Sequence, residues 1–138
     1  MVWTANRVLT LVLGVLFTWL GFFGFFASLS MTAGILFVFD VDLVHNLIHL
    51  VTGLLALFAT FAETTFVEWS RLFNRIFGVI YLILGIAGLF PALYLDGRLL
   101  GITHVNAADN VLHIVVGLVA CIVGYVLAEY SATTRTAI

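Results

Sequence analysis

Residues 43–62 read LVHNLIHLVTGLLALFATFA, an apolar run without a single Asp, Glu, Lys or Arg. A helix of about 20 mostly apolar residues is what the hydrocarbon core of a bilayer, roughly 30 Å thick, requires. Three further runs are long and mostly apolar, namely residues 8–27, 72–91 and 107–128, with Arg75 and Asp109 as their only charged residues. The sequence therefore predicts four membrane-spanning helices.

The composition supports this class. Of the 138 residues, 64% are hydrophobic and 9% are charged, whereas soluble domains are roughly half apolar and about a quarter charged. Such a chain cannot build a polar surface, and its many Phe, Leu and Val residues exclude disorder. The net charge of −2 and the scattered arginines exclude nucleic acid as a partner. We predict one all-α integral membrane domain, residues 1–138, with the lipid bilayer around it.

The arginines predict the orientation, because cytoplasmic flanks of membrane helices collect Lys and Arg. Four arginines fall on one side of the predicted spans: Arg7, Arg71, Arg75 and Arg135. Only Arg98 falls on the other side. We expect both termini in the cytoplasm. The apolar run Ile35 to Phe39 is too short to span, so we expect it in the interface or over the bundle.

The two halves of the chain match when one is shifted by 64 residues. The matching pairs are Arg7 with Arg71, Gly21 with Gly85, Asn46 with Asn110, His49 with His113, and Gly53 with Gly117. Apolar helices match by chance at Leu and Val, but not easily at Arg, Gly, Asn and His together. We predict a four-helix bundle of two tandem helical-hairpin repeats, residues 7–63 and 71–127, related by a pseudo-twofold axis along the membrane normal.

The polar residues of the second and fourth spans each fall on one helix face, at about 100° per residue. Polar groups that face lipid cost free energy, so these faces must turn into the bundle. Residues four apart on a helix are neighbours, and the pseudo-twofold axis would bring both faces together. The candidate metal ligands are His45, His49, Asp109 and His113.

Three imidazoles and one carboxylate suit a zinc, iron or copper ion. Asn46 and Asn110 would orient these ligands by hydrogen bonds, without contacting the ion themselves. His104, in the loop before the fourth span, would add another imidazole or a route for ion delivery. In the haem alternative, His49 and His113 are axial ligands, with Gly53 and Gly117 leaving room for the macrocycle.

Two other interpretations need no ion. Asp42 and Asn106 stand where helix N-caps are expected, and Asp109 would then complete a capping box. The histidines and asparagines would form hydrogen bonds across the bundle, or they would handle protons or a solute. The sequence shows no nucleophile–base pair and no phosphate-binding glycine loop, so an enzyme is less expected.

With these features, the chain resembles the small bacterial four-helix membrane proteins described as domain of unknown function 4383. The resemblance covers nearly the whole length, notably residues 45–49, Gly53, residues 77–81 and residues 109–113. It implies a bacterial cytoplasmic (inner) membrane location and no particular activity. The alternative function to metal binding is a structural or accessory subunit of a larger respiratory, photosynthetic or transport complex, or of a homo-oligomer.

Overall fold

The computed structural model describes residues 3–62 and 68–127. Within them lie four long helices: α1 (Ala5–Ala27), α2 (Leu43–Phe61), α3 (Trp69–Ala87) and α4 (Ala107–Cys121), the last continued by the π-helical turn η2 (Ile122–Val126). All four are long and apolar enough to cross a membrane. The prediction of a small four-helix membrane protein is confirmed. Arg135, on which the predicted orientation partly rests, lies outside the described residues.

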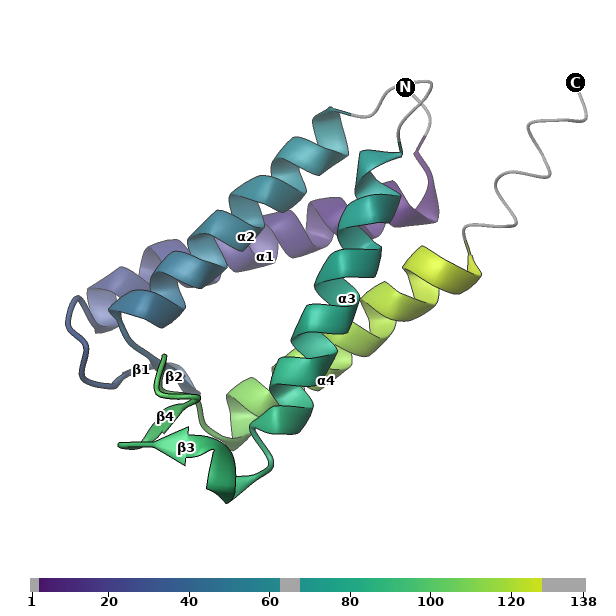
Figure 1. The fold of residues 1–138 in the computed structure, drawn as a ribbon. Coiled ribbons are helices and arrows are strands. Elements are labelled where there is room, and N and C mark those ends of the chain that lie inside the picture. Colours follow the sequence, from purple (N-terminus) through teal and green to yellow (C-terminus); the bar gives the residue numbers. More distant parts are fainter. Residues whose placement is uncertain (1–2, 63–67, 128–138) are drawn as a thin grey trace, which may run out of the picture.

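The helices form two antiparallel pairs, α1 with α2 and α3 with α4, and packing is closest within each pair. The loops inside both pairs lie at the same end of the molecule (Figure 1). We call it the hairpin end, because each loop folds into a small β-hairpin. The opposite end, where α1 and α3 begin, is called the N-terminal end.

The described residues are mostly helical, as predicted, but two short β-hairpins were not expected. Strands β1 (Gly34–Leu36) and β2 (Phe39–Val41) pair antiparallel, as do β3 (Tyr94–Leu95) and β4 (Arg98–Leu99). The second hairpin turns at Asp96 and Gly97, with φ of 50° and 76°, and an Asp-Gly pair favours such two-residue turns. The first hairpin turns at Phe37, whose ring stacks on Trp19 of α1 at a centroid distance of 5.7 Å. One ring of the apolar run therefore contacts α1, whereas Ile35, Phe37 and Val38 are 63–71% exposed.

Helix boundaries follow local capping. The Asp42 carboxylate accepts the His45 N–H at 2.8 Å, and Asn106 with Asp109 forms a capping box at the start of α4. Both predicted N-caps are confirmed. The third span ends at Ala87 instead of Pro91, with Gly88 as its C-cap, and Pro91 begins the separate 3₁₀ turn η1 (Pro91–Leu93).

Glycines allow close helix contact within both pairs. A Cβ on Gly21 would meet the Leu50 backbone, and one on Gly85 would meet the Ile114 backbone. The other matched contacts are Gly14 with Leu57, Gly78 with Cys121, Gly53 with Thr18, and Gly117 with Leu82. In membranes, small residues let backbones approach and gain dispersion contacts. Each contact in the first pair thus has a counterpart 64 residues later in the second pair.

An aromatic core joins the two pairs. Phe17 is completely buried, and its ring meets Phe77 and Tyr81 edge-to-face at centroid distances of 5.4 and 5.1 Å. The same ring meets the His49 imidazole at 4.9 Å. The core therefore borders directly on the polar face of α2.

Candidate metal centre

Three imidazoles meet between α2 and α4, and we call them the imidazole cluster: His45, His49 and His113. One ring nitrogen from each lies within 4.8 Å of the others. The His45 and His49 centroids are 4.3 Å apart, and His113 lies 6.0 Å from each of them. His45 and His49 share a face because they are four residues apart on α2, and the pairing of the two hairpins adds His113.

The imidazole cluster is buried and its nitrogens are unsatisfied. The three residues are 2–5% exposed, and none of their six ring nitrogens has a hydrogen-bond partner among the described residues. The backbone carbonyls of Asp40 and His104 approach the His45 ring without meeting hydrogen-bond geometry. A buried polar group left unpaired costs about 1–3 kcal/mol. Among the described residues, no hydrogen bond from these imidazoles across the bundle is seen.

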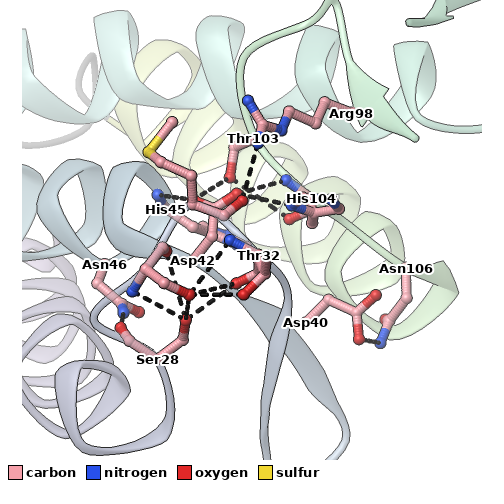
Figure 2. A network of polar contacts seen from close by, with 12 residues as sticks. Ser28, Thr32, Asp40, Asp42, His45, Asn46, Arg98, Thr103, His104 and Asn106 are labelled. Carbon is pink, nitrogen blue, oxygen red and sulfur yellow. Dashed lines mark hydrogen bonds and ion pairs between the residues drawn. The ribbon is translucent and has the colours of Figure 1, made fainter. Parts of the chain in front are cut away.

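A hydrogen-bond network closes the cluster on the hairpin side. Figure 2 shows its contacts around Asp42, Thr103 and His104. The completely buried Asp42 carboxylate accepts from the Thr103 hydroxyl at 3.0 Å and from the His104 N–H at 2.9 Å, and it meets the His104 Nδ1 at 3.0 Å. With the bond from the His45 N–H, these contacts fix the start of α2 to the loop before α4.

These contacts also keep Asp42 charged. Burial acts to raise the pKa of Asp42, but its hydrogen bonds outweigh burial and hold that pKa below its ordinary value. His104 thus lies in the closing network, on the carboxylate of Asp42.

Asp109 is buried beside this network but is not one of the grouped ligands. Its Oδ2 accepts the Asn106 N–H at 2.8 Å and the Asp40 N–H at 3.1 Å, which ties α4 to β2. Its Oδ1 is buried without a hydrogen-bond partner, and no described cation pairs with it. Its role as a fourth ligand stays a prediction, because the group of close ligand atoms contains only the three imidazoles.

Asn46 and Asn110, which were expected to orient the metal ligands, instead form hydrogen bonds with backbone carbonyls at the ends of the preceding helices. The Asn46 Nδ2 donates to the Ser28 carbonyl at 2.9 Å, and the Asn110 Nδ2 donates to the Gly88 carbonyl at 2.8 Å. A Cβ on Gly24 or Gly88 would collide with these amides. These contacts fix the preceding helix of each pair, and within the part of the chain that the structure describes neither amide is hydrogen-bonded to an imidazole.

A cavity of about 40 Å³ adjoins the three imidazoles. That space suits one ion with one small ligand, since a single water needs about 10–15 Å³ of comparable volume. A haem would need far more room, and the glycines expected to provide it are packed against Thr18 and Leu82 of the neighbouring helices. The described packing therefore favours an ion over a macrocycle.

Sequence reasoning missed Tyr81, which lines this cavity from α3. Its ring meets the His113 imidazole edge-to-face at 5.1 Å, and its hydroxyl lies 3.4 Å from the Thr52 hydroxyl. A lone tyrosine in an apolar helix carries no signal of such a role, because its position depends on how the two pairs cross.

Fold and site together define a small multi-pass membrane protein with a buried imidazole cluster at one end of its helices. The family model "Domain of unknown function (DUF4383)" matches residues 7–126, and the chain belongs to this family. Comparison with curated proteins and with solved structures found no match.

Proposed function

We propose that the protein is a membrane-embedded metal-binding protein whose ion is held by His45, His49 and His113. The supporting observation is the convergence of three buried imidazoles without hydrogen-bond partners. With Zn–N bonds of about 2.0–2.1 Å, two nitrogens on a tetrahedral ion lie about 3.3 Å apart. Small side-chain rotations would bring the observed nitrogens, within 4.8 Å of one another, to that spacing.

Charge supports a cation at this place. Imidazoles bind metals as neutral ligands, so the ion would keep its full positive charge. Asp42 and Asp109 lie buried within one helical turn of the cluster, and Asp109 has no described cationic partner. A buried anion such as the Asp42 carboxylate favours a cation nearby. We propose the unpartnered Oδ1 of Asp109 as an outer anion, which balances the charge of the ion and leaves its fourth position open.

The three imidazole nitrogens of the cluster indicate which metals the site would bind. Imidazole nitrogens suit zinc, copper, iron and nickel, whereas magnesium and calcium prefer oxygen. Three protein ligands with an open position are typical of sites where the ion also binds a water or a small molecule. We therefore expect a first-row transition metal.

Elemental analysis of the purified protein tests this proposal. After dialysis against Zn²⁺, Cu⁺ or Fe²⁺ and removal of excess metal, the protein in lipid nanodiscs should retain about one equivalent of at least one ion. His49→Ala combined with His113→Ala should abolish retention, because only His45 of the cluster remains. His104→Gln is the matched control, since its ring lies on Asp42. Equal metal content in the double variant and the native protein would overturn the proposal.

We further propose that the two helix pairs are tandem repeats in a bacterial cytoplasmic membrane, with the hairpin end outside. The matched glycine contacts support the repeat, and the arginine distribution supports the orientation. In a Cys121→Ser background, Asp96→Cys should react with a membrane-impermeant maleimide added to intact spheroplasts. Labelling only after lysis would contradict this orientation.

The alternative function is an accessory subunit of a larger membrane complex or a homo-oligomer. Exposed apolar side chains such as Phe58 and Ile83 motivate it, although lipid covers such surfaces equally well. Chemical crosslinking in native membranes separates the two cases. Discrete heavier species that persist after mild solubilisation would favour the subunit function.

A further inference from the structure

The cavity beside the imidazole cluster has an apolar character. Apart from the imidazoles, Thr103 and Tyr81, its lining consists of aliphatic side chains: Ile48, Leu84, Leu99 and Val105. An apolar cavity of this size stays dry unless several polar partners hold a water in it. An ion bound by the three imidazoles would therefore have its open position toward a space that water fills poorly.

The cavity is closed on the hairpin side. Leu99 and Val105 are 4% and 7% exposed, and the bonds of Thr103 and His104 to Asp42 hold that loop in place. A ligand that arrived from water would have to break this network or displace the buried aliphatic side chains.

On another side the cavity borders a lipid-facing groove. The groove lies between α2 and α3, encloses about 410 Å³, and is lined almost entirely by apolar side chains. Ile48, Tyr81 and Leu84 line both spaces, so these side chains form the wall between them. Tyr81 is fixed by its ring contacts, whereas Ile48 is 39% exposed at the groove. The cavity and the groove are therefore separated only by side chains that line both, and one of these, Ile48, is partly exposed.

From this geometry we infer that the metal centre binds a small, uncharged, lipid-soluble molecule, which reaches the ion laterally between α2 and α3. The inference rests on the proposed metal site and adds its ligand class and its entry route. Charged or strongly hydrated molecules are excluded by the cost of entering an apolar path. A molecule of two or three atoms fits the volume left beside the ion, and its coordination is reversible with no electron transferred.

Carbon monoxide on Cu⁺-loaded protein is a suitable probe, because it is uncharged, lipid-soluble and gives an infrared band when bound. In nanodiscs, the native protein should show one bound-CO band, and flash photolysis should give a single rebinding phase. Leu84→Trp thickens the wall and should slow rebinding about tenfold, the factor for a barrier raised by about 1.4 kcal/mol. Leu84→Ala thins the wall and should accelerate rebinding.

Ile76→Trp is the matched control, because Ile76 lines the groove but not the cavity. It should leave the rebinding rate unchanged. If no Cu⁺ is retained, this inference falls, and the metal site falls with it only if Zn²⁺ and Fe²⁺ are not retained either. Retained Cu⁺ without a bound-CO band would overturn the inference and leave the metal site standing. Equal rates for Leu84→Trp, Leu84→Ala and Ile76→Trp would overturn the lateral route.

Discussion

The two ends of the bundle bury polar side chains in opposite ways. At the N-terminal end, an amide cluster joins α1 to α3: Asn6, Thr10, Ser70 and Asn74, all at most 7% exposed. The Asn74 Nδ2 donates to the Asn6 Oδ1 at 2.9 Å, and the Thr10 hydroxyl donates to the Asn74 Oδ1 at 2.9 Å. At the hairpin end, the imidazole cluster makes no such bonds among the described residues.

This difference distinguishes a polar cluster that only packs from a polar cluster that can bind a ligand. Amides and hydroxyls of the amide cluster satisfy one another, so this cluster needs nothing from outside the chain. The imidazoles instead converge with their nitrogens unpaired, which is costly unless another partner completes them. Only the hairpin end is therefore expected to respond to a ligand.

The largest predicted effect is stabilisation by metal. A ligand at about 100 times its Kd stabilises the folded state by about 2.7 kcal/mol. We expect Zn²⁺ or Cu⁺ to raise the free energy of unfolding of the native protein by this order in detergent micelles. His49→Ala should remove the metal response, whereas Asn74→Ala should keep it. An equal metal-induced rise in the free energy of unfolding of His49→Ala and Asn74→Ala would show that the imidazole cluster is not the metal site.

The next effect concerns the network that closes the imidazole cluster. Asp42→Asn should lower the free energy of unfolding by about 2 kcal/mol, because it weakens an N-cap and the charge-assisted bonds from the loop before α4. Chemical denaturation at neutral pH measures this. Thr32→Ala, in an exposed turn, is the control and should change little.

The lowered pKa of Asp42 predicts how the stability of the native protein and of Asp42→Asn should differ with pH. Because the folded-state pKa of Asp42 is lowered, its stabilisation is complete above its ordinary pKa and is lost as the pH falls through the lowered value. The native protein should therefore lose stability in acid more steeply than Asp42→Asn. Parallel acid profiles would contradict the assigned pKa direction.

A smaller effect is expected in the amide cluster. Asn74→Leu removes an amide that bonds to both Asn6 and Thr10 and should cost about 1 kcal/mol, near the values measured for buried polar pairs in a membrane protein. Metal content should stay at one equivalent. A loss of metal in this variant would show that the two ends are coupled.

The smallest effect is the most discriminating. In metal-free protein, His49→Leu should change the free energy of unfolding by less than about 0.5 kcal/mol or raise it, because it removes nitrogens that have no partners. The same replacement at Asn74 is destabilising. A clear destabilisation by His49→Leu without metal would indicate that the imidazole is held by packing alone.

Much of this arrangement could be read from the sequence. The length of the four apolar runs determines the spans, and the 3.6-residue period places His45 and His49 on one face. The carboxamide and carboxylate at positions 106 and 42 predicted the helix starts, because such side chains accept backbone N–H groups.

The remaining features depend on contacts between distant residues. The turn at Phe37 is stabilised by stacking on Trp19, which no local pattern announces. The Asp109 carboxylate binds the Asp40 N–H of a strand that was not predicted. The contact of Tyr81 with His113 depends on the crossing of the two helix pairs.

Metal-edge X-ray absorption on protein loaded with one equivalent of Zn²⁺ tests the central claim most directly. The buried imidazoles predict a first shell containing three histidine nitrogens at about 2.0–2.1 Å, with the multiple-scattering pattern of imidazole rings. That pattern should be lost in a variant with all three histidines of the cluster replaced by alanine. A shell of oxygen atoms alone, or an identical spectrum in that variant, would contradict a metal centre at the hairpin end.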